Sequence, residues 1–144
     1  MSGSRASSAA LHASCVALRG QAVLITGASG SGKSGLALQL IAFGADLIAD
    51  DKTMLKRHDN TLIATAPDSI KGQIEARGVG ILAATPVVTA RVRFVVDMDS
   101  LETERLPQMN ETQHLGVTLP LIRRAKEPHF AAAIWLLLKG GRVA

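Results

Sequence analysis

The sequence predicts an α/β domain with a mixed, mainly β sheet and few helices. Short runs rich in Val, Ile, Leu and Ala recur between turn residues, and only a few segments have the apolar spacing of a helix. The length of 144 residues suits one domain with a substantial core. We expect residues 1–10, rich in Ser, Ala and Gly, to be a flexible arm and residues 11–144 to form the single domain.

Composition excludes several classes of protein. Hydrophobic residues make up 47% of the chain and aromatic residues only 3%, so stacking platforms for nucleic-acid bases are scarce. The net charge of +4 is weak support for a phosphate ligand. Cys15 is the only cysteine, which excludes an internal disulfide and a thiolate metal site. No apolar stretch approaches the roughly 20 residues of a membrane span, so we expect a cytoplasmic protein without membrane or nucleic-acid partners.

The first predicted strands form a hairpin. Residues 11–18 and 21–26 have strand character, and Arg19-Gly20 is typical of a turn. In a tight antiparallel pair, early residues of the first strand lie beside the end of the second, so we expect His12 near Gly27. From spacing alone, a structural or surface histidine is the favoured interpretation of His12.

A glycine-rich loop lies between the apolar run Ala22–Thr26 and a helical pattern that begins at Lys33. It has the G-x-x-x-x-G-K-[ST] pattern of a phosphate-binding P-loop, and a purely structural turn is the alternative. Glycines let successive N–H groups converge on an anion, Lys33 adds a positive charge, and the Ser34 hydroxyl can bind Mg²⁺. We expect nucleotide phosphates to be bound by Gly27, Ala28, Ser29, Gly30, Ser31, Gly32, Lys33 and Ser34.

The predicted helix extends to Phe43, with Gly44 as its stop, and a short strand then ends at Asp50-Asp51. Ligands of open α/β sheets bind beyond the carboxyl ends of parallel strands, so one of these carboxylates can serve Mg²⁺ or a nucleophile. Successive residues of an extended chain point to opposite faces, and we do not expect both to reach one phosphate equally. A solvated acidic turn is the alternative.

Residues 52–58 and 61–66 flank a polar turn and predict a second hairpin, which makes the sheet mixed. Pro67 then opens a predicted helix that ends before Gly78. Glu75 and Arg77 close this segment, and on spacing alone they are a solvated pair.

Val92–Asp99 is a clear strand that also ends in acids, Asp97 and Asp99, and periodicity cannot choose between this pair and Asp50-Asp51 as the Mg²⁺-linked carboxylates. Residues 101–119, which include Glu104, Arg105 and His114, are predicted to form a mobile loop over the site. Residues 128–139 predict a final apolar helix, with Trp135 in the core or at a subunit contact.

Three blocks of sequence point to one family. They are the Gly27–Ser34 loop, the strand ending at Asp50-Asp51, and the run Ile74-Glu75-Ala76-Arg77-Gly78-Val79-Gly80-Ile81 that follows Ala66-Pro67. From about Leu11 to Arg124 the chain resembles the catalytic domain of HPr kinase/phosphorylase, and the third block is the most specific match. The resemblance implies a P-loop kinase-like fold. It also implies ATP- and Mg²⁺-dependent phosphorylation of a serine of the phosphocarrier protein HPr, a reaction that the family can reverse by phosphorolysis.

The resemblance also implies roles for individual residues. Lys33 matches the phosphate-binding lysine, and Ser34 and Glu75 match the Mg²⁺ ligands. Asp51 matches the base that takes the serine proton, and His12 matches the neighbouring catalytic histidine. Most of the rate acceleration would come from charge neutralisation and alignment, so Asp51 need only accept a proton late.

The chain departs from the family in several places. Arg105 lies about where the family has a catalytic-loop arginine, in a poorly matching context. The stretch linked to dephosphorylation is replaced by residues 121–128, which leaves the reverse reaction open. Longer members carry an amino-terminal domain, and we expect this chain to be a short form without it. The resemblance further implies a homo-oligomer, specifically a hexamer.

Other functions fit the same residues. A small-molecule P-loop kinase is one, because a short domain with a mobile loop also suits low-mass substrates. A nucleotide-binding regulatory module without turnover is another. A GTPase is less favoured, because no Asn-Lys-x-Asp guanine motif occurs in the sequence.

Overall fold

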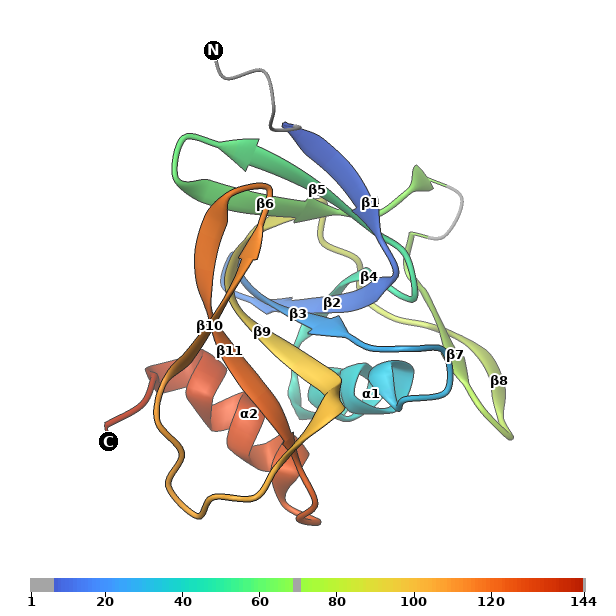
Figure 1. Ribbon diagram of the computed structural model, residues 1–144. Coiled ribbons are helices and arrows are strands. Elements are labelled where there is room, and N and C mark those ends of the chain that lie inside the picture. Colours follow the sequence, from blue (N-terminus) through green and yellow to red (C-terminus); the bar gives the residue numbers. More distant parts are fainter. Residues whose placement is uncertain (1–6, 69–70, 144) are drawn as a thin grey trace.

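The computed structural model describes residues 7–68 and 71–143. Within them, nine strands form one mixed sheet, and a separate two-stranded hairpin lies beside α1 (Figure 1). The main path across the sheet is β1 (Ser8–Leu11), β5 (Thr53–His58), β6 (Thr61–Thr65), β9 (Thr89–Glu102), β3 (Gln21–Thr26), β2 (Ala13–Leu18) and β4 (Asp46–Ala49). The prediction of a mixed, mainly β sheet with few helices is confirmed.

The long strand β9 joins the parts of this sheet. Its first residues pair antiparallel with β6, and its later residues run parallel to β3 on one side and to β11 (Val117–Ala125) on the other. Strand β10 (Asn110–His114) pairs with β11. Strands β3 and β4 are both antiparallel to β2, so they point the same way. The carboxyl ends of β3, β4 and β9 therefore lie at one edge of the sheet, where ligands of such sheets bind.

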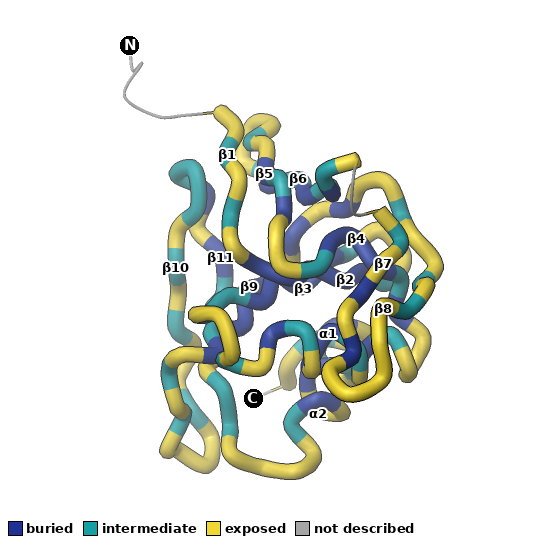
Figure 2. The backbone as a smooth tube through the Cα atoms, turned by 90° about the vertical axis from the view of Figure 1, so that its right-hand side faces the viewer, coloured by how far each residue is buried: buried dark blue, intermediate teal, exposed yellow. Residues whose placement is uncertain are grey.

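Helices α1 (Lys33–Phe43) and α2 (Phe130–Gly140) cover one face of the sheet (Figure 1). Val23 and Ile25 of β3 pack against these helices, whereas Ala22 and Leu24 face the β5–β6 and β11 side. Both faces of β3 are buried, which explains why its sequence is continuously apolar rather than alternating (Figure 2). A strand held on both faces gives the loop that follows it a rigid base.

The two predicted hairpins are confirmed as β2–β3 and β5–β6, and the predicted helix after the glycine-rich loop is confirmed as α1. The predicted flexible arm at residues 1–10 is wrong from Ser8 onward, because Ser8–Leu11 pairs with β5. Strand β1 is an edge strand without buried residues, so its sequence has no apolar pattern that predicts a strand. Residues 1–6 lie outside the described part of the chain.

The helix predicted to begin at Pro67 is wrong over its second half. Gln73–Ala76 is strand β7, which forms a hairpin with β8 (Gly80–Ala83). Ile74 and Ala76 are buried and alternate with exposed neighbours, which is the period of a strand. Residues 69–70, which the predicted helix includes, lie outside the described residues.

The mobile loop predicted over residues 101–119 is also wrong. Residues 101–102, 110–114 and 117–119 belong to β9, β10 and β11, residues 115–116 form a turn, and residues 103–109 form an irregular connection. Strand β10 is an edge strand of polar residues, so its sequence looks like a loop. Burial lowers the pKa of His114 at the end of this strand, consistent with its packing in the hairpin. In the described ranges, no helix is long and apolar enough to span a bilayer.

Candidate active site

The loop between β3 and α1 has the backbone of a phosphate-binding nest. Gly27, Gly30 and Gly32 have φ values of 145°, 84° and 103°, in the left-handed region that side-chain-bearing residues avoid. A Cβ added at Gly27 would lie 2.5 Å from Ser31 Oγ, so this position also has no room for a side chain. The Ser31 N–H donates to the Ala28 carbonyl at 3.0 Å and closes the turn. The loop is therefore preformed by its glycines.

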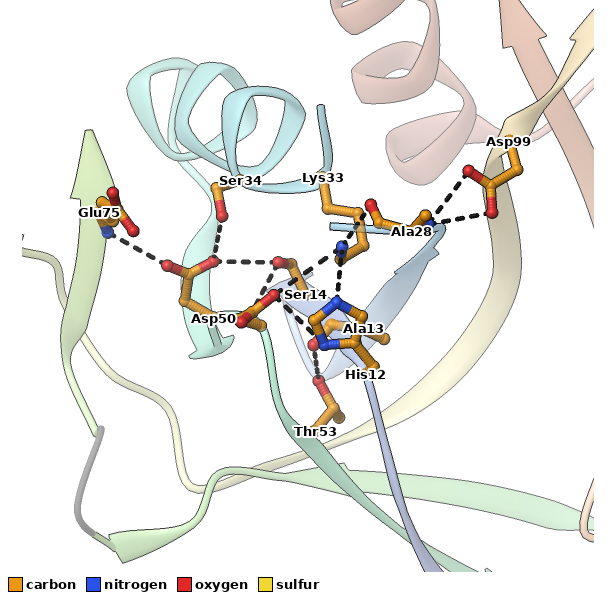
Figure 3. A network of polar contacts seen from close by, with 11 residues as sticks. His12, Ala13, Ser14, Ala28, Lys33, Ser34, Asp50, Thr53, Glu75 and Asp99 are labelled. Atoms are coloured by element: carbon orange, nitrogen blue, oxygen red, sulfur yellow. Dashed lines mark hydrogen bonds and ion pairs between the residues drawn. The ribbon is translucent and has the colours of Figure 1, made fainter. Parts of the chain in front are cut away.

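Lys33 is held in a fixed position at the start of α1. Its side chain is only 3% exposed, and Nζ donates to the Ala28 carbonyl at 3.1 Å (Figure 3). The same nitrogen lies 3.3 Å from His12 Nε2 and 3.8 Å from Asp51 Oδ1. The charge of Lys33 therefore lies where the glycine-rich loop, the start of β2 and the acidic pair come together.

His12 lies where the hairpin register predicts. Ala13 pairs with Thr26, so the preceding residue, His12, falls beside Gly27. An ammonium can only donate, so His12 Nε2 accepts from Lys33 and the ring proton sits on Nδ1. Nδ1 lies 3.5 Å from Asp51 Oδ1. His12 therefore links the lysine to the carboxylate.

Asp50 is the centre of a hydrogen-bond network that joins three elements (Figure 3). Its Oδ1 accepts from Ser34 Oγ at 2.7 Å and from Ser14 Oγ at 3.0 Å, and its Oδ2 accepts from the Glu75 backbone N–H at 3.1 Å. Sequence reasoning assigned no separate role to Asp50 or to the fully buried Ser14. The β2–β4 pairing, which brings Ser14 close to the end of β4, could not be deduced from local pattern.

The expectation that Asp50 and Asp51 do not reach one phosphate equally stays a prediction, but the chain does not continue through them as an extended strand. Asp51 has φ of 66°, a left-handed conformation that is uncommon for a residue with a side chain. Its N–H donates to Ser14 Oγ at 3.2 Å, which stabilises this sharp bend. The bend turns the chain so that both carboxylates line the same cavity. Backbone strain of this kind is characteristic of functional sites.

This cavity has a volume of about 460 Å³ and lies between the glycine-rich loop and the β7–β8 hairpin. We call it the phosphate cavity. Glu75, Arg77 and Val79 of the hairpin segment face it from one side, opposite the loop. The block of sequence that contains Glu75 therefore lies at the site, although on a strand rather than on the predicted helix. The polar residues that line the cavity are Ser29, Lys33, Ser34, Asp50, Asp51, Glu75 and Arg77.

The two acids of β9, Asp97 and Asp99, do not line the phosphate cavity. The register of β9 against β11 jumps from Asp97 opposite Arg123 to Leu101 opposite Arg124, so Met98–Ser100 form a bulge. Asp97 accepts from the Asp99 N–H at 2.9 Å and from Ser100 Oγ at 2.7 Å, which shapes this bulge. Both Asp99 oxygens accept from the Ala28 N–H, at 3.0 and 3.1 Å. The bulge therefore supports the glycine-rich loop from outside the phosphate cavity.

Comparison with known proteins identifies the family. The model of the HPr Serine kinase C-terminal domain matches residues 4–123. The chain belongs to this family. The HPr kinase/phosphorylase of Limosilactobacillus reuteri (strain DSM 20016) is 34% identical over 125 residues, which are 78% of this chain and 39% of that protein. The HPr kinase/phosphorylase of Bacillus mycoides is 31% identical over 140 residues, which are 84% and 45% of the two chains.

A solved structure supports the same assignment. The Hpr(Ser) kinase/phosphatase from Coxiella burnetii aligns with a TM-score of 0.76 at 28% sequence identity, covering 94% of this chain and 97% of that chain. The P-loop kinase-like fold expected from the sequence agrees with this neighbour. The chain spans about two fifths of the length of the curated relatives described above.

The structure does not bring Arg105 to the phosphate cavity. Arg105 lies on the 103–109 connection and lines a different cavity, of about 260 Å³, against α2. That cavity also contains Glu102, Glu104 and Arg123 and shares no lining residue with the phosphate cavity. Among the residues that the structure describes, Arg105 and the phosphate-cavity residues therefore lie at separate cavities.

The residues present are compatible with Mg²⁺ bound together with phosphates. In residues 7–68 and 71–143, no group of three or more His, Cys, Asp and Glu side chains forms a metal cage. Mg²⁺ instead keeps several waters and binds one or two carboxylates plus substrate phosphates. Ser34 and Asp50 already share a hydrogen bond at the cavity, and Glu75 lines it. Burial raises the pKa of the Cys15 thiol above its usual range, so this thiol is not an available nucleophile or ligand.

Proposed function

We propose that the chain is an ATP- and Mg²⁺-dependent protein serine kinase that phosphorylates an HPr-like phosphocarrier protein. One observation carries the proposal: the Asp51 carboxylate lies 3.8 Å from the ammonium of Lys33, at the phosphate cavity. Its side chain is 60% exposed and therefore accessible to an incoming hydroxyl. The names of the relatives, HPr kinase/phosphorylase, support serine of HPr as the acceptor.

The glycine-rich loop binds the phosphates of ATP in this proposal. Its backbone N–H groups and the amino-terminal end of α1 favour a negative charge, and Lys33 neutralises part of the charge that develops during transfer. Ser34, Asp50 and Glu75 would hold Mg²⁺. When bound, this ion neutralises charge on the outer phosphates and helps to align them. Asp50 also keeps the Ser34 hydroxyl oriented toward the cavity through their 2.7 Å hydrogen bond.

Asp51 acts as the base. The serine oxygen forms a bond to the terminal phosphorus as the bond to the bridging oxygen breaks, and the serine proton moves to the Asp51 carboxylate. ADP and phosphoserine are the products. His12 donates from Nδ1 toward Asp51 and accepts from Lys33, so it holds the base and the cation in one geometry. In phosphorolysis, inorganic phosphate takes the place of ADP: a phosphate oxygen bonds to the phosphorus of phosphoserine as the bond to the serine oxygen breaks. Asp51 would return the proton to that oxygen, and pyrophosphate and serine are the products.

The remaining family properties belong to this proposal. A soluble phosphocarrier as acceptor supports a cytoplasmic location. Oligomerisation is supported by the resemblance, and Leu136 of α2 and Phe43 of α1 leave apolar side chains exposed on the helix face of the sheet. Sedimentation or light scattering of the purified chain measures the oligomeric state directly, and a hexamer is expected.

The test is transfer of labelled phosphate. The purified chain is incubated with Mg²⁺, ATP labelled in the terminal phosphate, and an HPr-type carrier. We expect label on a serine of the carrier, and none on a carrier whose acceptor serine is replaced by alanine. Labelling of a metabolite without labelling of the carrier would support a small-molecule kinase instead. Tight ATP binding without transfer to any acceptor would support a regulatory module.

A further inference from the structure

A second cavity adjoins the glycine-rich loop on its other side. It has a volume of about 360 Å³ and shares Gly32 and Gly35 with the phosphate cavity. Its other walls come from the first turns of α1, from Met98 of the β9 bulge, and from the segment that leads from the end of β11 into α2, including Arg124, Glu127 and Phe130. The acids Asp50, Asp51 and Glu75 line only the phosphate cavity. The two cavities therefore flank the start of α1, and the proposed base and Mg²⁺ ligands line only the phosphate cavity.

The position of this second cavity follows from the sheet. Strands β3, β9 and β11 are parallel neighbours, so their carboxyl ends meet at one edge. The glycine-rich loop leaves the first of these strands, and Arg124-Ala125 end the last. The bulge in β9 occurs between Asp97 and Leu101, where the register to β11 jumps, and it places Met98 against the loop. A crevice beyond adjacent parallel strands is where open α/β sheets bind their ligands.

The lining of this cavity suits a flat, partly apolar group that carries hydrogen-bond acceptors. Met98, Pro128 and Phe130 offer apolar and aromatic surface. Arg124 Nε is buried and has no hydrogen-bond partner within residues 7–68 and 71–143. Arg124 itself lines the cavity, and its guanidinium carries five N–H donors, so an acceptor on a bound molecule would pair with those that face the cavity. Pockets that combine apolar walls with a few polar groups are typical of small-molecule sites.

We propose that this cavity binds the base and ribose of the nucleotide, while the phosphates pass over Gly32 into the phosphate cavity. Arg124 would donate to an acceptor of the base or ribose, and Met98 would contact the face of the base. This inference rests on the proposed ATP-dependent function. It assigns nucleotide recognition to the bulge and the β11–α2 segment, so that the acceptor protein approaches only from the side of Asp51.

Binding measurements distinguish recognition of the base and ribose from recognition of the phosphates. Affinities for ATP and for inorganic triphosphate are measured with Mg²⁺ by calorimetry. Ala125→Phe fills the cavity and should weaken ATP by about tenfold or more, because the base no longer fits, while triphosphate stays within about twofold. Arg124→Gln should weaken ATP alone by about threefold to tenfold. Ala132→Phe places the same side chain at an exposed position of α2 and should change neither affinity.

The outcomes distinguish this inference from the proposed function. Equal losses of ATP and triphosphate in Ala125→Phe, or no loss of ATP in both lining variants, would overturn the base site. Equal affinity of the native chain for ATP and triphosphate would overturn it too, but would leave the phosphate cavity intact. Failure of the native chain to bind either ligand would contradict the proposed function as well.

A labelling experiment on the native chain avoids any effect of substitution on folding. After irradiation with 8-azido-ATP, the label should map to Met98 or to residues 124–131. Label confined to the β7–β8 hairpin, on the far side of the phosphate cavity, would overturn the proposal.

Discussion

Asp50 and Asp51 follow β4, and Asp97 and Asp99 lie in β9, so both pairs of acids come near the carboxyl ends of similar apolar strands at one edge of the sheet. The first pair lines the phosphate cavity and contacts Ser34, His12 and Lys33 side chains. The second pair accepts from the backbone N–H groups of Asp99 and Ala28 and from Ser100. The first pair thus meets mainly side chains at the phosphate cavity, although Asp50 also accepts from the Glu75 backbone N–H. The second pair meets mainly backbone N–H groups outside that cavity.

The difference shows that the hydrogen-bond donors around a carboxylate indicate whether its role is structural or chemical. Backbone N–H groups donate to both Asp97 and Asp99, and these hydrogen bonds stabilise the bulge and the loop. Asp51 instead meets two side chains at distances of 3.5 and 3.8 Å, and it stays accessible. A weakly held, accessible carboxylate can take a proton from a substrate, whereas a tightly bonded one serves as structure.

The largest effect on nucleotide binding is expected for Lys33→Ala, which removes the cation that distinguishes the first pair from the second. Loss of this buried charge should weaken Mg²⁺–ATP binding by about a hundredfold or more, because Lys33 is the charged donor of the loop. Calorimetry measures the affinity. Lys52→Ala, which removes an exposed lysine next to Asp51, is the matched control and should bind normally. Near-native binding by Lys33→Ala would contradict the assigned phosphate site.

The next effect is expected for Asp50→Asn. The amide retains the size of the side chain but loses the charge that would face Mg²⁺, so transfer should fall about tenfold to a hundredfold at low Mg²⁺ and partly recover at high Mg²⁺. Initial rates across a Mg²⁺ titration give the answer. Asp46→Asn, at the other end of β4, should not alter the Mg²⁺ dependence. The same loss at every Mg²⁺ concentration would mean that Asp50 acts only through the loop structure.

A smaller effect is expected for Asp99→Ala. Ala28 does not line the phosphate cavity, so loss of its two contacts with Asp99 should loosen the loop rather than remove a ligand. Nucleotide affinity should fall by about threefold to tenfold, the effect of one charge-assisted hydrogen bond, while kcat at saturating ATP changes little. Steady-state kinetics separate the two constants. A large fall of kcat with unchanged KM would mean that Asp99 takes part in the reaction. It would then not differ in role from Asp50 and Asp51.

The smallest functional effect is expected for Asp97→Asn. This substitution removes one acceptor from a local bonding pattern and should lower the free energy of unfolding by about 1 kcal/mol, with nucleotide affinity and transfer rate within about twofold of native. Thermal or denaturant unfolding measures the loss. A transfer rate reduced a hundredfold would show that Asp97 competes successfully with the first pair for catalysis.

The sequence predicted what depends on local pattern. The Gly27–Ser34 loop has its form because of glycines within the loop itself, and the position of His12 follows from a two-residue turn between adjacent strands. The strand ending at Asp50 was predicted from its apolar run for the same reason. These features need no information from distant parts of the chain.

Other features arise from long-range packing and could not be predicted. Glu75 was expected on a helix, because Ile74 alone fits a helical stripe as well as a strand. The bend at Asp51 depends on Ser14, which is 37 residues away, and the bulge that carries Asp99 depends on the register against β11. The position of Arg105 depends on β10 pairing with β11 rather than remaining a loop.

The most direct test of the account is the rate of phosphoryl transfer to the carrier serine by Asp51→Asn at saturating Mg²⁺–ATP. Removal of a positioned base should lower this rate by about a hundredfold to ten-thousandfold, while the affinity for ATP stays close to native. A transfer rate within a fewfold of native would contradict the central claim that the accessible carboxylate beside Lys33 accepts the proton of the incoming serine.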